Sequence, residues 1–467
     1  ARALSLARAR SLAAAGRSEA AAGALTALAS DEGATDDERL GYAHSAAEQL
    51  VRCGRFHEGI GASRAALRRG GLGSLSRTAL GAVAAAFLRR LWLRYRGLEP
   101  AARQRDARAH ERLDRQWATA TSLTTVDGLF AIDLSTRHCL AALRHGDLPR
   151  VVRALGLEAT HQAAMGASPA WLEHLCVTLN RLAAEAADPE SLGWSHYVSG
   201  AVAYHRGEFE RALPAFDAAE ALLVHERPDV VTLVNNAEVY STYGLLCRLH
   251  AGRFDELDDR ARALLERADD RGDVHMRLLI EAAVLPAVAL WRGRADLAAL
   301  ALEGYRRGAH RSGRHLHLAY SVLSASLLAL HRGEPAAVFE HFRRAAPHAR
   351  SQFLVVPVVR PFARWLLATA ELARAKERQR GWWRARLRTT LLERERAAWV
   401  SPFSQLLRGQ LALARGYTCE GLAALRASRD GFSQQGMPTF ARVAAGRCPP
   451  LAAWAPGVPA ERLDLGT

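Results

Sequence analysis

The sequence has almost no lysine and lacks the short motifs on which most enzyme families depend. Lys376 is the only lysine among 467 residues, and it is not part of the Gly-Lys-Ser/Thr loop that cradles phosphates in P-loop NTPases. The His-Arg-Asp and Asp-Phe-Gly motifs of protein kinases are absent, as are the HExxH zinc motif and the GxSxG nucleophile elbow. We therefore expect that this chain alone is not an enzyme and needs no cofactor or metal ion.

Long apolar runs and paired cysteines are missing as well. No stretch of eighteen apolar residues is free of charge, and the chain opens on a basic, Ala-rich segment that does not resemble a signal peptide. The six cysteines are scattered without a CxxC spacing, which is typical of reduced thiols in a cytoplasmic protein. We expect a cytoplasmic protein without a membrane partner. Because the chain lacks an initiator methionine, we also expect a fragment of a longer protein.

A short motif recurs along the chain and predicts helical hairpins. A basic residue or Ala precedes a glycine, and a polar or aromatic residue follows before an Ala- or Leu-rich stretch. Glycine tolerates the left-handed conformation that ends a helix, and a basic side chain favours the negative end of the helix dipole. The central glycines, 207, 252, 293 and 333, are 45, 41 and 40 residues apart. The motif is centred on Gly16, Gly54, Gly146, Gly207, Gly252, Gly293, Gly333 and Gly416.

A fixed period of this size is typical of stacked helical repeats, each of which cannot bury its own apolar face alone. Because β-branched runs are scarce and no long window alternates apolar and polar residues, we expect an all-α fold. The spacing predicts a right-handed α-solenoid of antiparallel, tetratricopeptide-like hairpins with a period of about 40 residues. Small residues five positions after a glycine, such as Val151, Ala212 and Ala298, would let paired helices approach.

The chain divides into five regions by composition and regularity. Residues 1–70 are N-terminal helical hairpins, 71–133 a less regular linker with helices, and 134–350 regular tetratricopeptide-like repeats. Residues 351–447 are C-terminal helices, and 448–467 form a Pro-rich tail.

Several local features carry their own expectations. Residues 35–38 predict a helix start of the capping-box type, and Pro357 with Pro361 predicts a kinked helix or a break in the stack. The acidic pairs at 258–259 and 269–270 are expected on solvated faces. His310, His315 and His317 form a weak metal-like cluster, but residues two apart on a helix do not face each other, so we expect solvated histidines.

Positive charge is concentrated in two arginine-rich segments. Residues 87–117 contain nine arginines and four acidic residues, a net charge of +5, and residues 371–399 reach the same value with Trp382 and Trp383 between the basic residues. Arginine interleaved with aromatic residues suits phosphates, nucleic acid or an acidic partner surface. The alternative is that these arginines lie on solvated helix faces. The candidate anion- or partner-binding residues are Arg89, Arg90, Arg94, Arg96, Arg384, Arg386 and Arg388.

Sequence blocks in the first half of the chain resemble a known family. In chain order the blocks are residues 93–98, 112–117, 123–127, 137–138, 142–147 and 154–159. They are similar to the C-terminal helical region of large bacterial serine/threonine kinases that also carry an AAA-like (STAND-type) NTPase module and tetratricopeptide-type repeats. The segments 188–189, 271–273 and 454–457 also fit that region, whereas the tail from Arg442 departs from it.

This resemblance implies a regulatory or scaffold arm attached to a kinase and a nucleotide switch. The kinase and NTPase catalytic residues of such proteins would lie outside this chain. We therefore expect a non-catalytic signalling module that binds a protein or peptide partner on the solenoid surface, including kinase or NTPase domains of the same polypeptide. The alternative is a helical protein that binds nucleic acid or phosphate through its arginine-rich segments, with a binding constant that falls steeply with salt.

Overall fold

The structure is a computed structural model of the chain and describes residues 2–70, 78–104, 106–124, 128–222, 231–270, 272–309, 316–395 and 397–446. Across these residues the chain forms helices and turns without any β-strand, which confirms the all-α expectation. The predicted Pro-rich tail at 448–467 lies outside the described residues. So do residues 71–77, at the start of the predicted linker region, and both His310 and His315.

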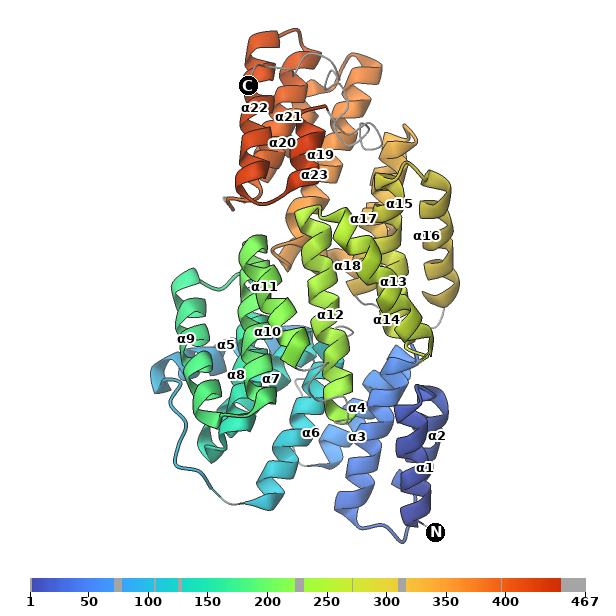
Figure 1. Cartoon of the computed structure of the whole chain (residues 1–467), viewed down its shortest axis with the longest axis vertical. Coiled ribbons are helices and arrows are strands. Elements are labelled where there is room, and N and C mark those ends of the chain that lie inside the picture. The colour runs from blue at the N-terminus through green and yellow to red at the C-terminus, as the bar shows by residue number, and fades with distance from the viewer. Residues whose placement is uncertain are drawn as a thin grey trace.

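The N-terminal helices lie at one end of the long axis of the molecule and the C-terminal helices at the other (Figure 1). Between them, α5–α11 lie on one side and α13–α16 on the other, with α12 in the middle. The N-terminal helices are α1 (Arg2–Ala14), α2 (Ser18–Ala29), α3 (Asp36–Arg52) and α4 (Phe56–Arg69). The next group comprises α5 (Ala79–Arg96), α6 (Ala107–Thr124), α7 (Gly128–His145), α8 (Leu148–Ala164), α9 (Pro169–Ala186), α10 (Pro189–Arg206) and α11 (Phe209–Glu220).

The second half of the chain is also helical. Its central helices are α12 (Val231–Ala251), α13 (Phe254–Asp270), α14 (Val274–Leu279), the π-helical turn η2 (Ile280–Val284), α15 (Leu285–Trp291), α16 (Ala295–Ala309), α17 (Leu316–His331) and α18 (Pro335–Val355). The C-terminal helices are α19 (Val359–Arg378), α20 (Trp382–Glu393), α21 (Ser401–Ala414), α22 (Thr418–Gln434) and α23 (Pro438–Ala444).

The glycine motif marks helix ends throughout the described chain. All eight glycines of the motif have positive φ, between +68° and +86°, so the predicted left-handed turns are confirmed. Successive helices pack on each other across these turns, as α10 does on α11 and α21 on α22. The small residues predicted to allow close packing, Val151, Ala212 and Ala298, are fully buried.

Other local predictions are also confirmed. The Thr35 hydroxyl accepts a hydrogen bond from the Glu38 amide while the Glu38 carboxylate accepts one from the Thr35 amide, which is a complete capping box. The chain leaves the helical conformation at residues 356–358 between α18 and α19, where Pro357 interrupts it. Because proline lacks an amide hydrogen, it cannot continue the backbone ladder of α18.

One continuous stretch, Val274–Trp291, is long and apolar enough to cross a membrane by length and composition. It runs through α14, η2 and α15, and 67% of it is buried inside the fold. A core helix of a soluble protein passes the same test, so this stretch is only weak evidence for a membrane span.

Candidate functional site

Helix α5, which carries the first four candidate arginines, has its large apolar side chains on the outside. Ala82, Ala86 and Leu93 are its buried residues, and its main packing partner is α7. Six large side chains, on the opposite side of the helix from these buried residues, are exposed. They are Val83 (36% exposed), Phe87 (60%), Leu88 (65%), Leu91 (46%), Trp92 (49%) and Tyr95 (83%). We call this set the α5 apolar face.

Two of the candidate arginines on α5 point inward and form ion pairs with fully buried carboxylates. The Arg90 Nε lies 2.6 Å from Glu158 Oε1 on α8, and Arg89 pairs with Asp133 on α7. Both carboxylates have no exposed side-chain surface. These arginines therefore hold α5 onto the fold and are not free to bind an external anion.

The buried Glu158 carboxylate has further hydrogen-bond donors. Ser135 Oγ donates to Oε2 at 3.0 Å and Gln162 Nε2 donates to Oε1 at 3.0 Å. The indole of Trp171 in turn donates to the Gln162 side chain at 2.8 Å. Since a buried charge is tolerated only when it is paired and hydrogen-bonded, this network explains how a helix with small and basic inner residues remains attached.

The other two arginines of α5 lie near its C-terminal end. Arg94 is exposed, and its guanidinium carbon is 5.1 Å from the centre of the Trp171 ring. Arg96 is half-buried and donates to the carbonyl oxygens of Gly97 and Glu99, both at 3.0 Å. Arg94 is therefore the candidate whose charge stays available at the edge of the α5 apolar face.

The second arginine-rich segment also contains both exposed arginines and an arginine that pairs with another helix. Arg384 and Arg386 on α20 are exposed, and the Arg384 guanidinium lies 5.3 Å from the ring centre of Trp383, which is 65% exposed. The Arg388 Nε is 3.6 Å from Glu371 Oε1 on α19, and its guanidinium lies over the Phe339 ring of α18. Arg388 thus links helices, while Arg384 and Arg386 leave a small basic surface beside a tryptophan.

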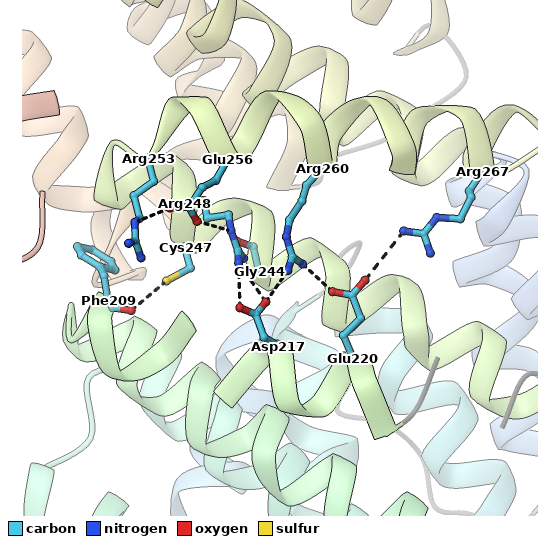
Figure 2. Close-up of polar contacts among 10 residues, drawn as sticks. All are labelled: Phe209, Asp217, Glu220, Gly244, Cys247, Arg248, Arg253, Glu256, Arg260 and Arg267. Carbon is cyan, nitrogen blue, oxygen red and sulfur yellow. Dashed lines mark hydrogen bonds and ion pairs between the residues drawn. The ribbon is translucent and has the colours of Figure 1, made fainter. Parts of the chain in front are cut away.

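A connected polar network joins α11, α12 and α13 (Figure 2). Arg248 is buried and donates to Asp217 at 3.0 Å and to Glu256 at 3.3 Å. Arg260 donates to Asp217 at 2.8 Å and to Glu220 at 2.7 Å. Each of these carboxylates is matched by an arginine from a neighbouring helix, so the network fixes helix packing.

Two expectations of solvated side chains are wrong. Asp258 is buried and forms ion pairs with Arg262 on its own helix and with Arg292 at the end of α15. His317 is also buried, with its ring centre 4.4 Å from that of His275. In both cases the side chain lies on the inner side of its helix, and contacts from distant parts of the chain, which sequence spacing does not reveal, cover it.

A buried tyrosine–histidine cluster lies between α10, α12 and α17. The Tyr204 hydroxyl is 2.8 Å from His250 Nδ1 and 3.2 Å from the Tyr320 hydroxyl. Burial lowers the pKa of His250 to about 3, so the ring is neutral at pH 7. Because the three side chains are almost fully buried, the cluster is a structural contact of the core.

The described residues contain no group of three or more His, Cys, Asp or Glu side chains placed to hold a metal ion. No model of a known protein family matches the chain, and a search of curated proteins finds no similar sequence. The feature that sequence reasoning missed is the α5 apolar face. Its signal was present in the spacing of Phe87, Leu91 and Tyr95, but a helical period alone does not say which side of a helix faces the core.

Proposed function

We propose that this chain is a non-catalytic scaffold of helical hairpins that binds a protein partner through the α5 apolar face. The observation that carries the proposal is the outward orientation of six large apolar side chains on one helix. Single exposed apolar residues are ordinary, but contiguous patches of several hundred Å² mark interaction sites. Phe, Tyr and Trp each carry about 150–250 Å² of surface, so three such rings with two leucines reach that size.

The charges of α5 indicate the chemistry of the partner. The helix contains four arginines and no acidic residue, and the exposed Arg94 lies at the edge of the α5 apolar face. A second copy of α5 would bring only further arginines to the interface. A helix that lays an apolar side along α5 and carries carboxylates beside it would satisfy both the apolar surface and Arg94. We therefore infer an acidic amphipathic helix as the partner.

The wider expectations from the sequence belong to the same proposal. The regular spacing of the glycine turns supports a right-handed solenoid of tetratricopeptide-like hairpins, which a crystal structure of the chain tests. The resemblance of residues 93–159 supports a regulatory arm of a serine/threonine kinase signalling protein in the cytoplasm. Reading the gene upstream of the codon for Ala1 tests the kinase assignment, because the kinase and NTPase motifs should lie there in the same reading frame.

The docking proposal is tested with two synthetic peptides. Each is an amphipathic helix of about 18 residues with a leucine face, and the peptides differ only in the flanking residues, which are Glu in one and Lys in the other. We expect fluorescence anisotropy to show binding of the Glu peptide and at least about tenfold weaker binding of the Lys peptide. The triple variant Phe87→Gln, Leu91→Gln and Tyr95→Gln should abolish binding of the Glu peptide.

The variant residues are exposed and Gln is a good helix former, so the variant should keep the circular dichroism of the parent chain. Leu300→Gln on α16 is the matched control, because Leu300 is 61% exposed on another helix. Equal binding of both peptides, or equal loss in the control, would overturn the proposal. If neither peptide binds but anionic vesicles do, and if vesicle binding is lost when Phe87 is replaced, α5 would instead bind a lipid surface.

The alternative function, binding of nucleic acid, has one observation in its favour. Trp383 is exposed beside Arg384 and Arg386, and bases stack on such rings while arginines contact phosphates. The Arg384→Glu and Arg386→Glu variant should then lose a strongly salt-dependent affinity for single-stranded oligonucleotides. An affinity that is indifferent to salt and to these changes would exclude it.

A further inference from the structure

A cavity of about 820 Å³ lies where the ends of four helices meet in the N-terminal part of the molecule. The C-terminal ends of α2 and α4 and the N-terminal parts of α3 and α6 line it. Five arginines and three acidic residues face this space. Its volume lies within the range of small-molecule sites in proteins.

Helix α6 supplies three of the arginines from one side. Arg108, Arg112 and Arg115 follow one another at spacings of four and three residues, which places them along one stripe of a helix. All three line the cavity, and Arg39 of α3 and Arg69 of α4 line it from the other helices. Five arginines from three helices therefore line a common space.

The acidic residues of the cavity are already matched. Asp36 pairs with Arg39, and Arg115 bridges to Asp37 at 3.6 Å and to Glu111 at 3.0 Å. Arg115 also donates to the Asp37 carbonyl oxygen at 3.3 Å, so it connects α6 to α3. These contacts use Arg39 and Arg115 and neutralise the three carboxylates.

The remaining arginines have no such contacts. Arg69, Arg108 and Arg112 are exposed, and their guanidinium groups form no ion pair with any other described residue. Three exposed arginines without ion pairs around one cavity give it an excess of positive charge, which suits an anion with several charges. Because arginine binds phosphate oxygens in a bidentate manner, a ligand with two or more phosphate groups fits them best.

We infer that this cavity binds a small anion that carries two or more phosphate groups. None of the described residues that line the cavity is aromatic, and its apolar wall consists of Leu40 with alanines. The site therefore lacks a surface on which a nucleobase could stack, and recognition rests on the phosphate chain. Since α5 does not line the cavity, this inference stands independently of the docking proposal.

Isothermal titration calorimetry of the whole chain tests the inference with three probes, which are inorganic orthophosphate, inorganic triphosphate and ATP. We expect triphosphate to bind at least about tenfold more tightly than orthophosphate, with an affinity that falls as salt is raised. The double variant Arg108→Gln and Arg112→Gln should weaken triphosphate binding by about tenfold or more. The matched control is Arg307→Gln with Arg426→Gln, which removes two exposed arginines elsewhere and should leave the affinity unchanged.

Similar affinities for triphosphate and ATP would assign the site to the phosphate chain, and tighter binding of ATP would assign it to a nucleotide; both results support the inference. No binding of triphosphate at millimolar concentration would overturn it. An equal loss in the control variant would also overturn it, because the effect would then come from net charge alone. Tighter binding of a single-stranded oligonucleotide than of triphosphate, with the same sensitivity to Arg108 and Arg112, would show a nucleic-acid groove and overturn it as well.

Discussion

Buried histidines make this protein sensitive to acid at the scale of single residues. Burial lowers the pKa of four histidines to about 3 and that of His44 to about 4. In the unfolded chain these rings titrate near pH 6.5, so between the two values the unfolded state binds more protons. The part of the free energy of unfolding that depends on these histidines is therefore fully present above about pH 6.5, and it is lost as the pH falls toward 3. The four histidines are His138, His161, His205 and His250.

His138 is the best position to measure this effect, because neither ring nitrogen has a hydrogen-bond partner in the core. We expect His138→Leu to retain the stability of the parent at pH 7 and to lose about 1 kcal/mol less between pH 6 and pH 5. Urea denaturation at the three pH values measures this difference. His174→Leu is the control, because His174 is exposed. The same pH dependence in both variants would contradict the assignment.

At the scale of helical elements, the turn between α10 and α11 offers a sharp test of the glycine motif. Gly207 has φ +78°, and a Cβ there would overlap the indole ring of Trp399. Gly333 has a similar φ of +73°, but nothing lies within 4 Å of its Cβ position. Gly333→Ala therefore measures the left-handed strain alone, about 1–2 kcal/mol. Gly207→Ala should cost about 1–3 kcal/mol more, because the methyl group must displace the indole.

Chemical denaturation of both glycine variants checks this expectation, with circular dichroism to confirm that each variant folds. Equal costs for the two substitutions would mean that the Trp399 ring moves away freely and does not seal the turn.

The helices themselves were predictable from the sequence because their signals are local. The capping box at Thr35 and the glycine turns involve residues within one turn of each other. The α5 anchor is different, because Arg90 meets Glu158, a residue 68 positions away. Arg90 was therefore predicted as an anion-binding residue, and the exposed side of α5 was missed. The helical period of the sequence predicts that α5 is a helix. Which side of α5 faces the core depends on ion pairs to residues far away in the sequence.

At the scale of the whole molecule, segments near both ends of the chain pack against turns between helices in its middle. A Cβ at Gly54 would lie 3.2 Å from Val274 at the start of α14, and one at Gly252 would lie 3.0 Å from the Phe440 ring of α23. Together with the contact between Gly207 and Trp399, these approaches link segments that are far apart in sequence. A simple stack of independent repeats would lack such contacts, so unfolding should be cooperative across the C-terminal helices and α10–α11.

Trp399 is the residue through which this cooperativity can be tested. It is 2% exposed, lies in the turn before α21, and has its ring 5.6 Å from Phe209 of α11 and 5.5 Å from Phe362 of α19. Trp399→Ala removes contacts to both helices and should cost about 3–5 kcal/mol. Hydrogen exchange should then accelerate together in the α10–α11 turn and in α21.

The matched control is Trp383→Ala, because Trp383 is 65% exposed on α20. That substitution should change the stability by no more than about 0.5 kcal/mol and leave the exchange of both segments as in the parent. If Trp399→Ala instead accelerates exchange in α21 while the α10–α11 turn stays protected, the C-terminal helices fold independently of the turn on which they lie. The joint response would show that the Trp399 ring couples the C-terminal helices to a hairpin turn almost 200 residues earlier in the chain, because it contacts Phe209 of α11 and Phe362 of α19.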